Sequence, residues 1–329
     1  MADTMSRDHV SPDAFRHSLA QALDCPRHPE CGLFGPGSMT WRISRHSALF
    51  IGGFRALLLQ VAHPWVANGA RQHSAVYDDP IGRFHRTFRR VFTIVFGNMQ
   101  QVSESAHHMH AMHATVKGEL ASPTPRWKQG THYEANQVHA LLWVAATLWD
   151  SSVSIYELAV EPLTPHEKEQ YYEECFRYAA VFGISASAMP RDWSEFQQYF
   201  NDTLHSDILS VDDWGRNLSD FLFHELPVSF LSAPRARILT AELLPEHLRA
   251  AFALPPPTPC TRRVFRNTIL WFRLGYRCLP RHVKYVPAYF EALARLEART
   301  RAPRTTRLMN RLWIGQPELV FTPKRLVRA

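Results

Sequence analysis

Apolar side chains along most of this 329-residue chain recur every three or four positions, the spacing of an α-helix with one buried face. No run of convincing length alternates apolar and polar residues as a half-buried β-strand does. The pattern predicts helices over 39–69 (broken at His63-Pro64), 80–97, 99–119, 135–160, 165–182, 191–207, 211–224, 234–252 and 261–278. We therefore expect an all-α protein with a single helical domain.

Local signals refine this pattern. Asp79-Pro80 and Thr164-Pro165 combine an N-cap residue with a proline in the first turn, which is typical of helix starts. Glu167 completes a capping box with Thr164. The proline-rich run 254–259 is the best linker, so we divide the chain into an N-terminal arm, 1–44, a helical core, 45–257, and C-terminal helices with a basic tail, 258–329.

Composition narrows the class of protein. The longest apolar stretches, 54–69 and 138–149, are shorter than the roughly 20 residues of a membrane span or are interrupted by polar side chains. No apolar segment follows a basic one at the N-terminus, and five cysteines do not make a disulfide framework in a chain of this length. We expect a cytoplasmic protein with no transmembrane segment.

The formal net charge is +7, and the C-terminal tail from Arg295 to Arg328 is especially basic. This tail is a candidate for binding nucleic acid or an anionic membrane. No zinc finger or RNA-binding signature accompanies it, so we expect no specific nucleic-acid partner.

One predicted helix is rich in histidine: His107, His108, His110 and His113 lie within seven residues. Steps of three residues rotate a helical side chain by only about 60°, so the first, third and fourth of these wind along one broad side. Each imidazole has three open interpretations: a structural histidine, a metal ligand or a general base.

The neighbouring residues bear on which metal such a helix would hold. Glu104 and His107 match the Glu-x-x-His unit of di-iron bundles, but no second unit follows in the sequence. Zinc-protease, dinucleotide-binding, P-loop and hydrolase-elbow motifs are also absent. A single imidazole in an apolar helical pocket suits haem, which needs one proximal ligand.

The preceding helix carries Arg83, Arg86 and Arg90 at helical spacing, with Arg89 and Thr87 beside them. These arginines either form a solvated basic face or point inward. In the second case the guanidinium groups, which donate paired hydrogen bonds, suit either the carboxylates of haem propionates or a bound dioxygen molecule. The Thr87 hydroxyl adds one further donor.

Several blocks of sequence, taken in order, resemble one family. They are GGFRALLLQVAHPWVANGARQHS at 52–74, DPIGRFHRT at 79–87, MHATVKG at 112–118, LLWVAATLWDS at 141–151 and PLTPHEKEQYYEE at 162–174. Together they resemble the catalytic domain shared by latex-clearing proteins (rubber oxygenases) and MpaB-type oxygenases. The likeness covers roughly residues 45–257.

The resemblance implies a helical, globin-like core that holds one b-type haem and cleaves carbon–carbon double bonds of polyisoprenoid chains with O₂. In the latex-clearing branch the second histidine of a His-x-x-His pair is the axial ligand. This role carries over to His113, with His110 in support. An Arg-x-x-Lys-Thr motif of that branch carries over to Arg83, Arg86 and Thr87.

Two positions depart from that family pattern. Arg86 stands where the rubber enzymes have a lysine, and arginine does not lose its proton, so we expect no side chain capping the iron from this position. Ala145 stands where many members have histidine. Trp143 and Thr147, with Val144 and Leu148, are expected either to line the pocket or to pack in the core.

The sequence therefore predicts a haem b-dependent oxygenase that acts with O₂ on a small apolar, unsaturated substrate, isoprenoid-like or lipid. The metal ligand is His113, the other cofactor contacts are His110, Arg83, Trp143 and Thr147, and the catalytic residues are Arg83, Arg86 and Thr87. Two alternatives stay open: a non-catalytic haem-binding sensor or carrier, and a non-haem metal-carboxylate helical oxidoreductase. The sequence identifies neither an electron donor nor an oligomeric state.

Overall fold

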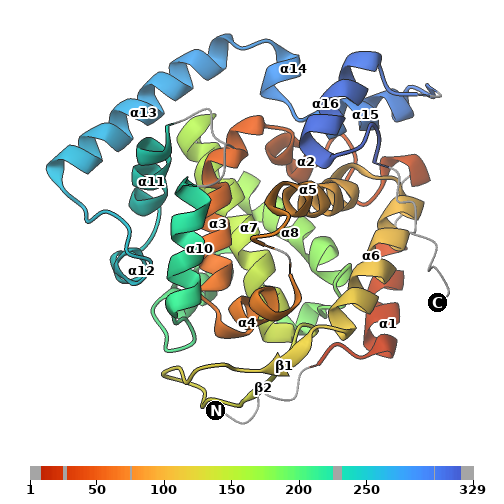
Figure 1. Ribbon diagram of the computed structural model, residues 1–329. Coiled ribbons are helices and arrows are strands. Elements are labelled where there is room, and N and C mark those ends of the chain that lie inside the picture. Colours follow the sequence, from red (N-terminus) through yellow and green to blue (C-terminus); the bar gives the residue numbers. More distant parts are fainter. Residues whose placement is uncertain (1–8, 25–27, 75, 225–231, 300, 320–329) are drawn as a thin grey trace.

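Figure 1 shows the computed structural model, which describes residues 9–24, 28–74, 76–224, 232–299 and 301–319. The described chain is predominantly α-helical, so the predicted all-α class is confirmed. The globin-like arrangement of the core stays a prediction. The α-helices are α1 (Pro12–Leu23), α2 (Met39–Ser44), α3 (Gly53–Val61), α4 (Pro64–His73), α5 (Pro80–Phe96), α6 (Met99–Ala114), α7 (Val138–Ala159), α8 (Pro165–Ala180), α9 (Trp193–Leu204), α10 (Asp213–His224), α11 (Ala233–Glu242), α12 (Glu246–Ala251), α13 (Pro259–Cys278), α14 (Arg281–Lys284), α15 (Pro287–Leu296) and α16 (Arg304–Ile314). Three short 3₁₀ helices are η1 (Pro29–Cys31), η2 (Ser47–Gly52) and η3 (Ala186–Ala188).

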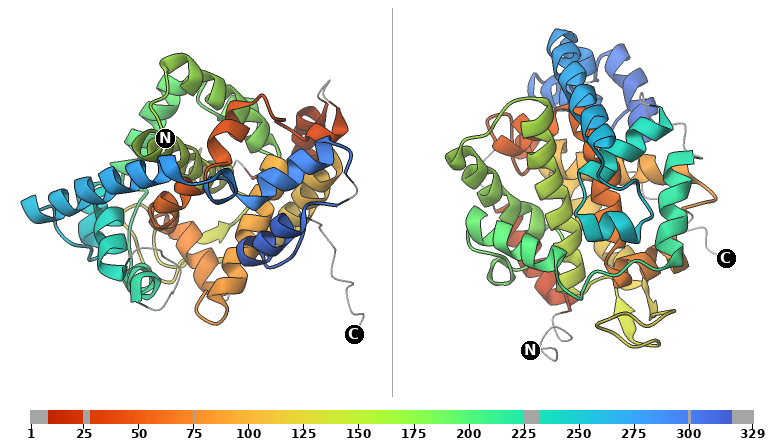
Figure 2. Two further views of the ribbon diagram at one scale, coloured as in Figure 1. Left: turned by 90° about the horizontal axis from the view of Figure 1, so that it is seen from above. Right: turned by 90° about the vertical axis from the view of Figure 1, so that its left-hand side faces the viewer.

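Helix α7 runs through the middle of the molecule and packs against η2, α2, α3, α8 and α13 (Figures 1 and 2). Among the described residues, α7 is the one single helix whose length and apolar character would allow it to cross a membrane. The bent pair 47–61 and 64–73 meets the same criteria of length and apolar character only when the two segments are taken together. Of the apolar window of α7, 67% is buried inside the protein, which is also how the central helix of a globular core is built. The main buried cluster contains residues from the N-terminal arm, the helical core and the C-terminal part of the chain, for example Phe15, Trp143 and Ala292.

The chain turns sharply at His63-Pro64, as the sequence predicted. The segments on either side, 47–61 and 64–73, meet at 99°. Proline cannot continue the preceding helix, and the His63 Nδ1 accepts the N–H of Trp65 at 3.2 Å as the cap of α4. The same ring lies with its Nε2 3.3 Å from Nδ1 of His139, and burial holds the pKa of His63 well below its usual range.

Several elements differ from the sequence prediction. The helix predicted over 39–69 is interrupted at His63-Pro64 as expected, and it is also divided earlier, into α2, η2 and α3. Strands β1 (Lys117–Glu119) and β2 (His132–Glu134) form an antiparallel pair, and each is too short to show the alternation that identifies a strand. Helix α6 consequently ends at Ala114 instead of continuing to 119. The predicted helix 234–252 is divided into α11 and α12, because Pro245 stands before the second of them. The tail, expected to be loosely patterned, contains α16 before its last residues, 320–329, pass outside the described part.

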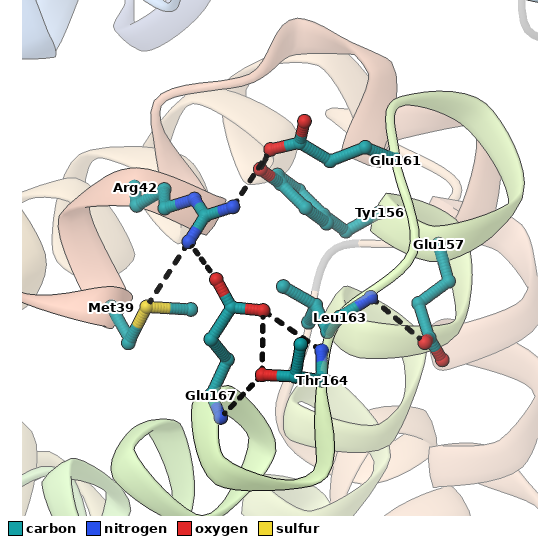
Figure 3. A network of polar contacts seen from close by, with 8 residues as sticks. All are labelled: Met39, Arg42, Tyr156, Glu157, Glu161, Leu163, Thr164 and Glu167. Atoms are coloured by element: carbon teal, nitrogen blue, oxygen red, sulfur yellow. Dashed lines mark hydrogen bonds and ion pairs between the residues drawn. The ribbon is translucent and has the colours of Figure 1, made fainter.

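A network of polar contacts joins α2 to the start of α8 (Figure 3). Arg42 donates to Glu161 at 2.8 Å and also to Glu167. Thr164 accepts the N–H of Glu167 at 3.2 Å while Glu167 accepts the N–H of Thr164 at 2.8 Å, so the predicted capping box is confirmed. The Thr164 N–H and the Arg42 guanidinium together hold the pKa of Glu167 at about 2.

A buried carboxyl group fastens the C-terminal segment to the body. Glu291 in α15 accepts the Leu319 N–H at 2.8 Å and Asn310 Nδ2 at 2.7 Å, with Arg295 and Glu318 as the neighbouring charges. Burial dominates these contacts and raises the pKa of Glu291 to about 7.

This raised pKa predicts a pH-dependent stability. A carboxyl group with a folded pKa above its unfolded value of 4.5 stabilises the fold in its protonated form. Its contribution is therefore complete below that value and is lost as the pH rises through about 7. We expect the free energy of unfolding of the native chain, relative to Glu291→Gln, to fall by about 3 kcal/mol between pH 4.5 and roughly pH 8. Urea unfolding across this pH range measures it, and parallel pH curves for the two proteins would contradict it.

Candidate functional site

Helices α5 and α6 lie side by side and carry most of the predicted site residues (Figure 1). Both helices begin with the polar caps that their sequences encode. Asp79 accepts the N–H of Gly82 at 2.9 Å ahead of Pro80. Asn98 and Gln101 form a reciprocal capping box. These caps fix where each helix begins, and therefore which residues face each other across the α5–α6 contact.

His113 lies in the last turn of α6. Its side chain is partly exposed, yet burial is the largest cause that lowers its pKa to about 4, followed by the charge of Arg90 and then by His110. Within the described residues neither nitrogen of this ring has a hydrogen-bond partner. His113 is thus a neutral imidazole with nitrogen lone-pair density available to a ligand.

The other three histidines of α6 face different neighbours. The His110 ring stacks on Phe15 of α1 at 4.2 Å, and its Nδ1 is buried with no partner among the described groups. His107 meets the edge of the same phenylalanine at 5.3 Å, and its Nδ1 lies 2.8 Å from the Ser103 carbonyl. His108 approaches Arg90, with 3.4 Å between Nε2 and Nη2. His107 and His110 therefore pack on α1, whereas His113 has the charge of Arg90 on α5 as its largest electrostatic influence.

A stripe of polar residues on α5 comprises Arg83, Thr87 and Arg90, which are four and then three positions apart and so share one side of the helix. Arg83 and Arg90 are partly buried, and burial lowers the pKa of each. Arg83 donates to the Ser74 hydroxyl at 2.5 Å, and Arg90 meets His108. Neither forms a salt bridge to a carboxylate anywhere in the described chain. Partly buried guanidinium groups without a counter-charge are groups with which an anion can pair.

Arg86 and Thr87 are both exposed. Arg86 forms an ion pair with Asp79 at 2.8 Å, at the N-terminal end of α5 and off the stripe defined above. Thr87 lies on the stripe, between the two partly buried arginines, where a large group lying against α5 would cover it. Sequence reasoning placed Arg90 on the arginine face without assigning it a role, and its distance of seven positions from Arg83 is the signal that pairs the two.

Trp143 and Thr147 are both buried in α7. The Trp143 indole donates to the Leu59 carbonyl at 2.8 Å and stacks on Phe200. The Thr147 hydroxyl donates to the Val144 carbonyl at 2.7 Å, within its own helix. These contacts satisfy both polar groups, and a contact of either residue with a cofactor stays a prediction.

Aromatic side chains of η2 and α5 contact one another along the first half of α5, where no residue before Phe92 is fully buried. Phe50 contacts Phe84 at 6.1 Å and Phe88 at 4.6 Å between ring centroids, and Phe54 contacts Phe223 at 5.1 Å. All of these except Phe223 are only partly buried, although they lie on elements that pack on the central helix or on α5. Phe50 also meets Trp313 of α16 at 4.3 Å, so these rings form a partly buried aromatic cluster beside α5.

The structure offers no ligand set for a metal-carboxylate centre in the part of the chain that it describes. No group of three or more His, Cys, Asp and Glu side chains there is positioned to hold a metal ion. Glu104, from the Glu-x-x-His unit, is exposed and accepts Gln100 Nε2 at 2.9 Å. A porphyrin metal needs only one protein ligand, so the same observation is compatible with His113 in that role.

Comparison with curated proteins found no match, and comparison with solved structures found none either. A family described as "ER-bound oxygenase mpaB/B'/Rubber oxygenase, catalytic domain" matches residues 41–274, which span the site helices α5, α6 and α7 and well over half of the chain. The resemblance seen in the sequence is therefore confirmed, and this chain belongs to the mpaB/rubber oxygenase catalytic-domain family.

Proposed function

We propose that this chain is a haem b-dependent oxygenase that acts with O₂ on an apolar, unsaturated substrate of isoprenoid or lipid type. Membership of the family supports an oxygenase that uses O₂ and a substrate. The observation that carries the haem assignment is the state of His113, which is neutral, partly accessible and without a hydrogen-bond partner among the described residues, beside partly buried arginines.

The donor set fits haem at the metal. An imidazole coordinates iron in its neutral form, and the pKa of about 4 keeps His113 neutral at any pH above roughly 5. His113 would hold the iron through one of its ring nitrogens. His110, one turn earlier, packs on Phe15 and would hold the end of α6 in place from the other side.

Two partly buried arginines of α5 suit the propionate edge of haem. Haem b carries two propionate carboxylates, and Arg83 and Arg90 are two partly buried cations that have no acidic partner among the described residues. Pairing with carboxylates would supply the missing counter-charge and strengthen the hydrogen bonds that the guanidinium groups donate.

When bound, the haem would supply the activation of O₂, and the protein would supply position, polarity and exclusion of water. The partly buried phenylalanines of η2, α3 and α5 would hold an apolar chain and keep water away from it. The Thr87 hydroxyl, which lies between Arg83 and Arg90 on α5, would donate a hydrogen bond to a propionate oxygen or to dioxygen. Arg86, held by Asp79, would stay outside this arrangement.

Oxygenation of an unsaturated chain by the haem-loaded protein tests the function. We expect incubation with squalene under ¹⁸O₂ to consume oxygen and to yield aldehyde and ketone fragments, because adding both atoms of O₂ across one C=C bond gives two C=O groups. Each carbonyl would carry one labelled oxygen, measured by mass spectrometry of the alcohols that immediate borohydride reduction gives, because reduction keeps the oxygen on carbon. Squalane, the saturated chain of the same length, is the matched control and should consume none.

The sensor or carrier alternative gives a different result in the same experiment. A protein that binds haem and O₂ but incorporates no label into squalene, a carotenoid or an unsaturated fatty acid would contradict the oxygenase assignment. Chemistry on the squalane control at the squalene rate would contradict the requirement for a double bond.

A further inference from the structure

Helix α13 has a second apolar side that faces away from the protein. Its inner side is buried through Ile269 and Tyr276, which join a small core with Ile51, Ile155 and Leu239. The side chains of Leu270, Trp271 and Leu274 are 53%, 71% and 48% exposed. These three lie within about 100° of one another around the helix, on the side opposite the buried residues. Leu279, which follows α13, and Val283 in α14 are also exposed.

The same segment is strongly cationic. Residues 259–284 contain no aspartate or glutamate and seven basic residues: Arg262, Arg263, Arg266, Arg273, Arg277, Arg281 and Lys284. None of the seven forms a salt bridge within the described residues. Helix α13 runs along the outside of the molecule and leads into α14 at the same edge (Figures 1 and 2). The cationic and apolar side chains are therefore presented together on an outer edge.

We propose that the outward face of α13 and α14, made of Leu270, Trp271, Leu274, Leu279 and Val283 with the seven basic residues, binds the surface of an anionic phospholipid bilayer. An apolar stripe flanked by arginine is the pattern of a helix that lies in the plane of a bilayer. Tryptophan favours the headgroup level, where its ring is apolar on one side and hydrated on the other. Each arginine near an anionic leaflet adds to the attraction.

Charge and apolarity together distinguish this occupant from two others. A second copy of the chain would bring seven like charges against seven, with no acidic residue in the segment to offset them. A nucleic acid would satisfy the arginines, but its phosphates would leave Leu270 and Leu274 against a charged surface. A bilayer surface satisfies both the arginines and the apolar stripe.

Co-sedimentation of the full chain with vesicles tests the proposal. We expect binding to phosphatidylcholine vesicles that contain about 30% phosphatidylserine and little binding to phosphatidylcholine alone. Binding should weaken as salt rises from about 0.1 M to 0.5 M, because the Debye length shortens. Arg266→Gln, Arg273→Gln and Arg277→Gln should each weaken it about fivefold. The combined variant Leu270→Ser, Trp271→Ser, Leu274→Ser should weaken it more than about tenfold.

A matched control comes from α16, where Leu308 and Leu312 are 61% and 66% exposed beside Arg304 and Arg311. Their double replacement by serine should leave vesicle binding unchanged. All of the replaced side chains except the partly buried Arg273 are exposed, and an unchanged thermal unfolding midpoint verifies that each variant folds.

Three results would overturn the proposal. One is equal loss of vesicle binding in the α13 and α16 variants. Another is binding of duplex DNA that survives the serine variant while vesicles do not bind. The third is a dimer in sedimentation analysis that the serine variant dissociates, again without vesicle binding. None of these measurements requires haem or oxygenase activity, so they are independent of the proposed function.

Discussion

Replacing His113 by alanine is expected to abolish the Soret band of the protein purified from haem-replete cells. The variant loses the imidazole nitrogen that would hold the iron, and haem needs one such protein ligand. The absorption spectrum of the variant beside that of the native protein measures the effect. Arg90→Gln should retain the band but weaken haem binding by about tenfold, because it removes a charge-assisted contact and leaves the iron ligand in place.

The matched control for this experiment is His108→Ala. His108 lies on the same helix and meets the same arginine, Arg90, but it is not the predicted ligand. The His108 variant should keep a full Soret band. A His113 variant that binds haem as tightly as the native protein would refute the ligand assignment, and so would a His108 variant that loses the haem.

The lowered pKa of His113 adds a pH dependence to the same measurement. A proton competes with iron for the imidazole nitrogen only near pH 4, because burial lowers the pKa to about that value. Haem occupancy should therefore be constant from pH 8 to roughly pH 5 and should fall below that range. If haem occupancy fell with a midpoint near pH 6.5, the ordinary pKa of histidine, His113 would be more solvated than its lowered pKa implies.

Breaking the buried ion pair between Arg55 and Asp150 is expected to cost about 3–5 kcal/mol of unfolding free energy. Both side chains are only 9% exposed, and the guanidinium donates to the carboxylate at 2.7 Å. The same guanidinium donates to the Ser151 hydroxyl at 2.6 Å and to the Leu243 carbonyl at 2.9 Å, so it joins α3, α7 and the end of α11. Arg55→Ala leaves the Asp150 charge buried without its cation, which is the source of the large effect.

A double replacement separates the charge effect from the loss of packing. Arg55→Met with Asp150→Leu removes both charges and keeps most of the volume, so it should recover at least about 2 kcal/mol relative to Arg55→Ala. Arg191→Ala, which breaks the exposed pair between Arg191 and Glu195, should have little or no effect on stability. Urea unfolding of the variants measures these differences. An Arg55→Ala protein as stable as the Arg191 control would show that Asp150 is solvated.

Helix-start signals transferred reliably from sequence to structure, because they act within a single turn. The caps at Asp79 and Thr164 and the break at Pro64 depend on side chains no more than three residues from the backbone groups they affect. The strands β1 and β2 were missed for the opposite reason. Each has three residues and pairs with a partner more than ten positions away, so no local periodicity marks them.

The candidate site was predictable in part. The sequence indicated His113 through the histidine density of one helix and a family resemblance, and it placed the arginines on one helix. It did not separate Arg86, which pairs with Asp79 at the surface, from Arg83 and Arg90, which are partly buried. Three residues within two turns of one helix differ in this way because of the elements packed around α5, which the periodicity of α5 alone does not reveal.

By itself the sequence determined the helical class, the positions of the caps and breaks, and the family to which the chain belongs, since each is encoded in short-range spacing or in the order of residues. Tertiary structure alone decided which imidazole stays neutral and unpartnered, which guanidinium groups lack a counter-charge, and which side of α13 is left uncovered. Burial and pairing depend on atoms brought together from distant parts of the chain, and they set the free energy of each charge and each apolar surface.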